Sequence, residues 1–168
     1  MFTKTETETF VYDTYIRTTA QKLWQALTSG DFSEKYWMGF RVEIEQRAGG
    51  RIYFHPPKGQ ETAFFKKEGG QVLVCEPNKK LVYEFAICMD TPEMAAKRES
   101  PSRVTYELTP MGDMVRLRLV HENLLSEDTV QDPNTMKGIN NGWPAILSSL
   151  KSLLETGQAI ALTRPSKD

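Results

Sequence analysis

The sequence contains few of the residues that most often build metal centres and redox sites. It has two histidines, His55 and His121, and two cysteines, Cys75 and Cys88, which do not form a Cys-x-x-Cys motif. Without a His-x-x-x-His or a paired cysteine motif, zinc ligands are scarce, so we expect no metal site. Both cysteines lie in or beside strand-like segments, which favours buried, reduced thiols over a disulfide.

The sequence also lacks an excess of one charge, long apolar runs and nucleotide-binding motifs. Its 21 basic and 22 acidic residues give a net charge of -1, which provides no general attraction to nucleic acid or to an anionic membrane. No apolar run approaches the roughly 20 residues of a membrane span. No G-x-G-x-x-G, G-x-x-x-x-G-K-[ST] or G-x-S-x-G motif is found. We expect a cytoplasmic protein with no cofactor and no nucleic-acid or membrane partner.

The apolar residues that are present suffice for one folded domain. Hydrophobic residues make up 39% of the 168 positions, which fits a single domain with its own core. Residues 1–8 are rich in Thr and Glu, have no apolar signal segment and are expected to form a flexible tail. We expect the domain to cover residues 9–158 and a second tail to cover residues 159–168.

The most informative segment is the last apolar stretch, which predicts one long amphipathic helix. Six large apolar residues recur at helical spacing and share one face: Ile139, Trp143, Ile146, Leu147, Leu150 and Leu154. Asn140 or Asn141 can cap the start of this helix, and Gly157 suits the left-handed residue that ends it. The helix therefore has one apolar face with which to cover a sheet.

Seven strands are expected in the rest of the chain. They are expected near residues 10–17, 40–46, 50–55, 70–76, 80–88, 102–109 and 114–121. Thr18 and Gln21 form a capping box that starts a short helix after the first strand, and residues 31–37 can form a second helical turn. Turns at residues 76–79 and 110–113 indicate short connections, and hence an antiparallel meander.

Two segments, residues 56–69 and 89–101, interrupt this meander and are expected to be loops. The second contains Met89 and Met94, which suit either an adaptable lid or a plain surface loop. The expected fold is therefore α+β, with a curved antiparallel sheet of about seven strands around a long C-terminal helix. Because one helix seldom fills a strongly curved sheet, we expect a cavity that is open at one end.

Alternation along the strands predicts which side chains face this cavity. In residues 114–121, for example, Leu119 and His121 share a face opposite to Arg116 and Arg118. The candidate ligand-binding residues are Trp37, Phe54, Tyr83, Phe85, Tyr106, Leu119, His121, Trp143 and Leu147. His121 is also the candidate catalytic residue, because only histidine titrates near neutral pH without help.

Each polar or aromatic candidate also has a purely structural interpretation. His121 can act as a general acid or base, can bind the polar end of a ligand, or can simply be hydrogen-bonded to a backbone carbonyl. The hydroxyls of Tyr83 and Tyr106 can bind a ligand, or the two rings can fill the core. Trp37 and Trp143 can stack on a ligand or pack between helix and sheet. The sequence leaves these alternatives open.

Several of these segments resemble one protein superfamily. They are residues 15–28 (YIRTTAQKLWQALT), Tyr36-Trp37, Gly49-Gly50, Val72-Leu73, Leu81-Val82-Tyr83, residues 102–108 (SRVTYEL) and Gly142-Trp143. In order and spacing they resemble the START-like (SRPBCC) superfamily, and within it the bacterial homologues of the heat-shock-chaperone ATPase activator. The resemblance covers roughly residues 9–157. It implies the helix-grip fold, also found in birch-pollen allergens, with relatives that bind lipids, sterols or aromatic compounds and some that are polyketide cyclases or dehydratases.

Three functional hypotheses follow. The first is non-enzymatic binding or sensing of a small apolar or aromatic molecule between sheet and helix. The second is a cyclase- or dehydratase-like enzyme in which His121 moves a proton and Tyr83 or Tyr106 polarises a carbonyl. The third is an interaction module related to chaperone activation, although we find no counterpart of the eukaryotic activator's separate chaperone-binding domain. A homodimer is compatible with all three.

Overall fold

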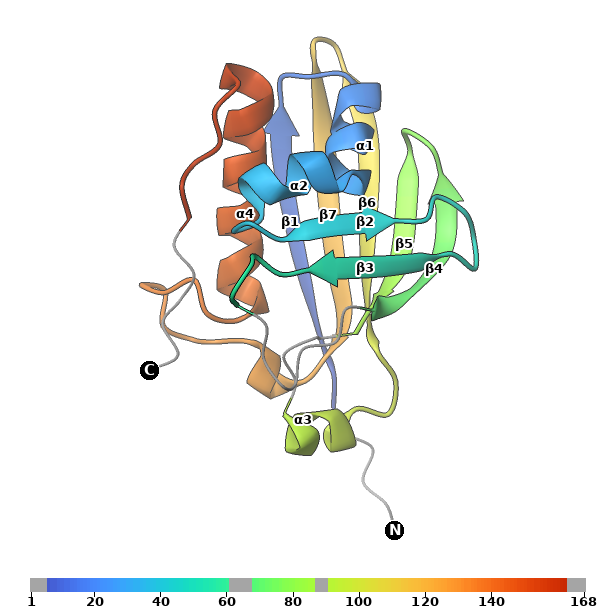
Figure 1. The fold of residues 1–168 in the computed structure, drawn as a ribbon, viewed down its shortest axis with the longest axis vertical. Helices are drawn as coiled ribbons and strands as arrows, with labels where there is room; N and C mark the ends of the chain where they lie inside the picture. The colour runs from blue at the N-terminus through green and yellow to red at the C-terminus, as the bar shows by residue number, and fades with distance from the viewer. Residues whose placement is uncertain (1–5, 61–67, 87–90, 163–168) are drawn as a thin grey trace.

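An antiparallel sheet of seven strands curls around one long helix (Figure 1). The computed structural model describes residues 6–60, 68–86 and 91–162. The elements are β1 (Glu8–Ile16), α1 (Ala20–Thr28), α2 (Gly30–Tyr36), β2 (Arg41–Ile44), β3 (Arg51–His55), β4 (Glu68–Glu76), β5 (Lys80–Phe85), α3 (Pro92–Lys97), β6 (Ser102–Met111), β7 (Met114–Leu124), the 3₁₀ turn η1 (Ser126–Asp128) and α4 (Ile139–Thr156). The predicted α+β fold is therefore confirmed.

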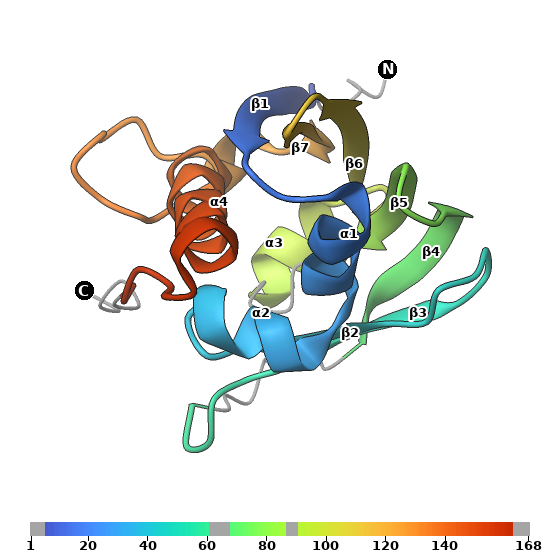
Figure 2. The ribbon, with the colours of Figure 1, turned by 90° about the horizontal axis from the view of Figure 1, so that it is seen from above.

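The sheet begins and ends with strands that are distant in its order but close in sequence. The strand order is β1-β7-β6-β5-β4-β3-β2, and every neighbouring pair is antiparallel. Seen from above, the strands follow an arc, and α1 and α2 lie between its ends (Figure 2). Helix α4 contacts β1, α1 and α2. One face of the sheet is therefore turned towards helices, and the other faces outwards.

The predicted turns and the predicted alternation are both confirmed. Asn78 and Gly112 have positive φ angles of 66° at the tight turns that join β4 to β5 and β6 to β7. Asn and Gly adopt this conformation at the lowest cost, which fixes the register of both hairpins. Along β7 the inward residues Leu117, Leu119 and His121 are all 0% exposed. The inner face of the sheet is thus buried beneath the helices.

Helix α4 ends as predicted but begins differently. Gly157 ends it in the left-handed conformation, with a φ of 83°. The helix begins at Ile139 after Gly138, and neither Asn140 nor Asn141 caps it. Instead, the Asn140 side chain accepts a hydrogen bond from the Val130 N–H at 2.9 Å and donates one to the Val130 carbonyl at 2.8 Å. The asparagine fixes the preceding loop, a role that depends on a contact across ten residues.

The start of α1 and the loop before β6 also differ from the prediction. Thr19, rather than Thr18, caps α1, because its hydroxyl accepts the Lys22 N–H at 3.2 Å. Part of the expected loop at residues 89–101 forms the helix α3, whose hydroxyl cap is Thr91 and whose first residue is Pro92. A threonine cap followed by proline is a recognised helix start, so this helix had a readable signal.

The expected tails partly join the folded domain. Strand β1 already begins at Glu8. After α4, the Ser149 hydroxyl donates to the Ile160 carbonyl at 2.8 Å, and Ala159 and Leu162 pack against the core. The domain boundaries at residues 9 and 158 remain predictions.

Further expectations concern the cysteines, Met89, a membrane span and a metal site. Cys75 is a free, half-buried cysteine, and burial raises the pKa of its thiol. Cys88 and Met89 lie outside the described residues. Within residues 6–60, 68–86 and 91–162, no helix is both long and apolar enough to cross a membrane. In the same ranges no three His, Cys, Asp or Glu side chains are grouped as metal ligands would be.

Candidate functional site

All nine candidate ligand-binding residues lie in one cluster between the sheet and α4, which we call the aromatic cluster. Its members come from β3, β5, β6, β7, α4 and the residue that follows α2: Trp37, Phe54, Tyr83, Phe85, Tyr106, Leu119, His121, Trp143 and Leu147. Phe85 is half-buried, and the other eight are at most 7% exposed. The strand alternation and the helical stripe therefore converge on the same place.

Trp143 of α4 is the centre of this cluster. Its ring centroid lies 5.2 Å from that of Trp37, 6.1 Å from Phe85 and 6.2 Å from Tyr106. Most of these rings meet at steep angles, the edge-to-face arrangement that aromatic pairs prefer. Helix α4 is thereby joined to the sheet by ring contacts.

A chain of hydrogen bonds also joins α4 to three strands. The Trp143 Nε1–H donates to His121 Nδ1 at 3.0 Å. Because Nδ1 accepts, the neutral ring carries its proton on Nε2, which lies 2.8 Å from the Ser102 hydroxyl. That hydroxyl donates in turn to the Phe85 carbonyl at 3.0 Å. Both nitrogens of His121 are therefore engaged.

Burial keeps His121 neutral. Loss of hydration lowers the pKa of His121 to about 3, the nearby Asp128 carboxylate opposes this shift, and the Arg98 guanidinium adds to it. A group with this pKa is a weak base at neutral pH. The geometry suits a residue that holds Trp143 and Ser102 in place better than one that transfers protons.

The two cluster tyrosines form a second buried hydrogen bond. The hydroxyl oxygens of Tyr83 and Tyr106 are 3.0 Å apart. Burial raises the pKa of both phenols, so each remains protonated at neutral pH. Two hydroxyl hydrogens share this one contact, and only one of them can lie between the oxygens. The other hydrogen has no acceptor in the hydrogen bonds of the described residues.

Charged side chains lie beside the cluster rather than in it. Arg98 and Asp128 form an ion pair in which their side chains are 10% and 4% exposed. Arg98 Nη1 lies 2.8 Å from Asp128 Oδ2, which also accepts the Leu125 N–H at 2.8 Å. This pair ties the end of α3 to η1, and Lys97 and Glu127 form a second pair at 2.7 Å.

Ser102, Arg98 and Asp128 were not among the predicted site residues. No local sequence pattern predicts their contacts, because Ser102 lies 19 residues from His121 and Arg98 lies 30 residues from Asp128. The pairing of β6 with β7 could have suggested Ser102, which lies one residue before Arg103, the partner of Glu122 in that ladder.

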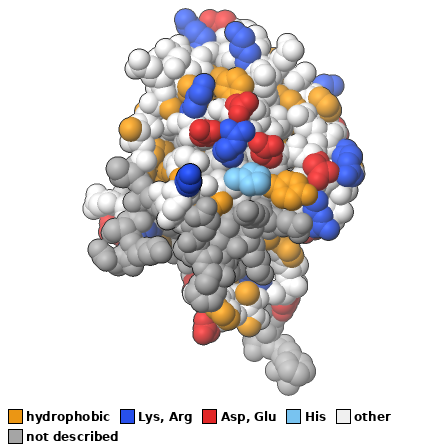
Figure 3. Space-filling model, viewed as in Figure 1, with side chains coloured by type: hydrophobic (Ala, Val, Ile, Leu, Met, Phe, Trp, Pro, Cys, Tyr) orange, Lys and Arg blue, Asp and Glu red, His pale blue; other side chains and the backbone are white. Residues whose placement is uncertain are grey.

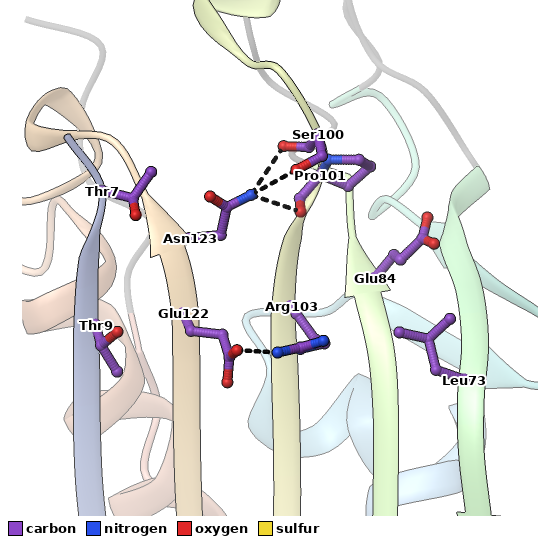
Figure 4. Close-up of a pocket in the computed structure, with 9 residues that line it drawn as sticks. All are labelled: Thr7, Thr9, Leu73, Glu84, Ser100, Pro101, Arg103, Glu122 and Asn123. Carbon is purple, nitrogen blue, oxygen red and sulfur yellow. Dashed lines mark hydrogen bonds and ion pairs between the residues drawn. The ribbon is translucent and has the colours of Figure 1, made fainter. Parts of the chain in front are cut away.

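Three hollows formed by described residues lie away from the aromatic cluster. One, of about 480 Å³, is on the outer face of the sheet, where Arg103, Glu122 and Glu84 project beside Ser100 and Asn123 (Figure 4).

The surface over α2 and β2 carries mixed charges rather than an apolar patch (Figure 3). Arg41 is paired there with three carboxylates, those of Asp31, Glu34 and Glu43. The hydrogen bonds that Arg41 donates to Glu34 and Asp31 raise its pKa. Such a surface, with its charges already paired, is usual on a solvated face and indicates no particular partner.

Comparison with known proteins supports the predicted family. The chain resembles a protein from Mesorhizobium loti, with 26% identity, a TM-score of 0.64 and coverage of 88% of this chain and 96% of that one. It shares its fold with the Aha1 dimer from Colwellia psychrerythraea, at 23% identity and a TM-score of 0.60, over 90% of this chain and 99% of that one. It also shares it with CalU16 from Micromonospora echinospora, at 18% identity and a TM-score of 0.61, over 89% and 77%.

A search of curated proteins gave no match. The sequence model of one family, described as Activator of Hsp90 ATPase homolog 1-like protein, matches residues 17–155. This match spans α1 to α4 and most of the sheet, and it agrees with the helix-grip architecture. The chain therefore belongs to the Activator of Hsp90 ATPase homolog 1-like family.

Proposed function

We propose that this protein binds a small, uncharged apolar or aromatic molecule between the sheet and α4, beside Tyr83 and Tyr106. The observation that carries the proposal is that the two hydroxyls of this buried tyrosine pair make one hydrogen bond among the described residues, so one of their two hydrogens is left for another acceptor. A buried donor without an acceptor is costly, and a ligand oxygen would satisfy it. The aromatic cluster around it provides the apolar surface that ligand sites use.

The ligand is expected to be neutral. The cluster contains no charged side chain, and His121 is itself neutral at physiological pH. Burying an unpaired charge among these rings would cost several kcal/mol, whereas buried apolar ligand surface gains about 25 cal/mol per Å². Phe85, the half-buried member of the cluster, is the side chain whose rotation would admit such a molecule.

A thermal-shift screen with flavonoids, fatty acids and sterols tests this proposal. A ligand at 100 times its Kd stabilises the folded state by about 2.7 kcal/mol. We expect reproducible shifts from neutral members of one class, and about tenfold weaker binding in the double variant Tyr83→Phe/Tyr106→Phe, in which no hydroxyl is left to donate to the ligand. Tyr53→Phe is the matched control, because the Tyr53 hydroxyl contacts Glu45 outside the cluster. The absence of any shift would reject the proposal.

In this proposal His121 is a positioning residue. Turnover by a cyclase- or dehydratase-like route would need a nitrogen of His121 to be available to the ligand, and both are engaged by Trp143 and Ser102. We therefore propose binding without turnover. We also propose that the protein acts in the cytoplasm. Consumption of a bound ligand in a timed assay, abolished by His121→Gln, would instead favour the enzyme.

Two protein partners are also proposed. The Colwellia psychrerythraea relative was solved as a dimer, which supports self-association of this chain. The family description supports a link to an Hsp90-type chaperone. Measuring the ATPase rate of the chaperone with and without this protein tests that link, and an unchanged rate at saturating protein would reject it.

A further inference from the structure

The outer face of the sheet has a regular pattern of three rows, each running across the strands. The middle one, here called the central row, contains Val11, Val120, Thr105, Val82 and Val74, which are direct neighbours on β1, β7, β6, β5 and β4. Its members are all β-branched. Val82 and Thr105 are 7% and 9% exposed, whereas Val11 at the edge is 52% exposed.

Charged residues flank the central row on both sides. On the side towards the hollow of Figure 4, the first charged row consists of Glu122, Arg103 and Glu84 on β7, β6 and β5. On the other side, the second charged row consists of Arg118, Glu107 and Lys80 on the same three strands. Read in the same direction, the first row is acidic, basic, acidic, and the second is basic, acidic, basic.

We infer that this face of the sheet binds the same face of a second copy of the chain. A two-fold axis along the central row would lay the first charged row of one copy over the second charged row of the other. Glu122 would then face Arg118, Arg103 would face Glu107, and Glu84 would face Lys80. Symmetry repeats the three contacts, so all the facing charges are opposite.

The same pattern disfavours the other two-fold arrangement. With the axis parallel to the strands, each charged row would face itself in reversed strand order. Glu122 would then face Glu84, and Arg103 would face Arg103 of the other copy. Facing like charges cost free energy and reject wrong pairings. The alternation of charge therefore selects one way of pairing two copies.

Several charges of the two rows are already paired within one chain. Arg103 is paired with Glu122, Arg118 with Asp13 of β1, and Lys80 lies 4.0 Å from Glu107. Glu84 has no ion pair among the described residues, although its neighbour across the strands is Arg103. In the dimer Glu84 gains Lys80 of the other copy, and this new pair is the clearest one to test.

The size of the surface predicts a weak dimer. Four strand spacings of about 4.8 Å give the central row a length of about 19 Å, and the charged rows lie about 14 Å apart. This footprint is well below the roughly 800 Å² that each partner contributes to a stable interface. We therefore expect a dimer that dissociates on dilution and at high salt, because the rim charges are screened.

Sedimentation equilibrium over a range of protein concentrations tests this surface. Glu84→Lys and Lys80→Glu each place like charges opposite one another, and we expect each to raise the dimer dissociation constant about tenfold or more. The double variant exchanges the two charges and should return the constant to near its original value. Residues 80 and 84 are about 13 Å apart along one strand, so rescue within a single chain is excluded. Lys35→Glu, on exposed α2, is the control and should change nothing.

This surface rests on the proposed self-association, and the experiment separates the two. A protein that stays monomeric at every concentration overturns both. A dimer that persists in Glu84→Lys and Lys80→Glu leaves self-association standing but overturns this surface. Circular dichroism of each variant shows that the monomer is folded, so loss of the dimer cannot be mistaken for unfolding.

Discussion

The two faces of strands β5, β6 and β7 are built from neighbouring residues but have opposite chemistry. On β6, Tyr106 belongs to the neutral aromatic cluster, while Thr105 and Glu107 on either side of it lie on the outer face. The inner face contacts α4 through aromatic rings and through hydrogen bonds between neutral groups. The outer face carries charges arranged in rows. Successive residues of one strand therefore belong to a buried, neutral face and to a charged outer face.

The largest effect is expected from the inner face. Trp143→Ala removes the central ring of the cluster and leaves His121 Nδ1 without a donor, so we expect a loss of about 3 to 5 kcal/mol in the free energy of unfolding. Trp143→Phe keeps a ring but not the N–H, and should cost less. Urea denaturation measures both. A loss below about 1 kcal/mol in the alanine variant would mean that the cluster does not hold α4 to the sheet.

A buried and an exposed ion pair provide a second comparison. Asp128→Ala removes the carboxylate that is bound by the buried Arg98 side chain and by the Leu125 N–H, so we expect a loss of about 3 kcal/mol in the free energy of unfolding. Arg103→Ala removes an exposed ion pair with Glu122 on the outer face and should cost at most about 1 kcal/mol in the monomer. Equal losses in dilute protein would contradict the distinction between the buried and the exposed ion pair.

The pH dependence of stability gives a smaller effect. The pKa of His121 is about 3 in the folded protein and near the ordinary value of 6.5 when unfolded. Below pH 6.5 the unfolded chain therefore binds a proton that the folded chain does not. The contribution of His121 to stability is complete above pH 6.5 and is lost as the pH falls towards 3.

Between pH 7 and pH 5 this loss is expected to reach about 2 kcal/mol, as measured by urea denaturation at each pH. His121→Gln should remove most of the dependence in this window, where carboxylates remain ionised. His55→Gln should retain it, because His55 lies at the end of β3 outside the aromatic cluster. A flat profile in the unaltered protein would contradict a neutral, buried His121.

The sequence predicted the inner face well because strand alternation and helical spacing are local. These periods place His121, Tyr106 and Trp143 on the apolar faces of their strands and helix. They do not predict which polar atoms meet, because the contact of Tyr83 with Tyr106 depends on how β5 and β6 are paired. The bond from His121 to Ser102 likewise depends on the ladder of β6 and β7.

Helix ends show the same limit. Both Thr18 and Thr19 are suitable caps, and the packing of α1 decides between them. Asparagine is a favourable helix cap, yet Asn140 and Asn141 do not cap α4. Both side chains instead donate to the Val130 carbonyl in the preceding loop. The charged rows of the outer face, in contrast, become visible only once the strand order and register are known.

The hydrogen bonds from Trp143 through His121 and Ser102 to Phe85 have one further consequence. An indole N–H can only donate and a carbonyl can only accept, so the two ends of this chain fix the direction of every bond between them. The three hydrogen bonds therefore cannot exchange donor and acceptor. As long as α4 stays in place, His121 keeps its proton on Nε2 and remains a single tautomer.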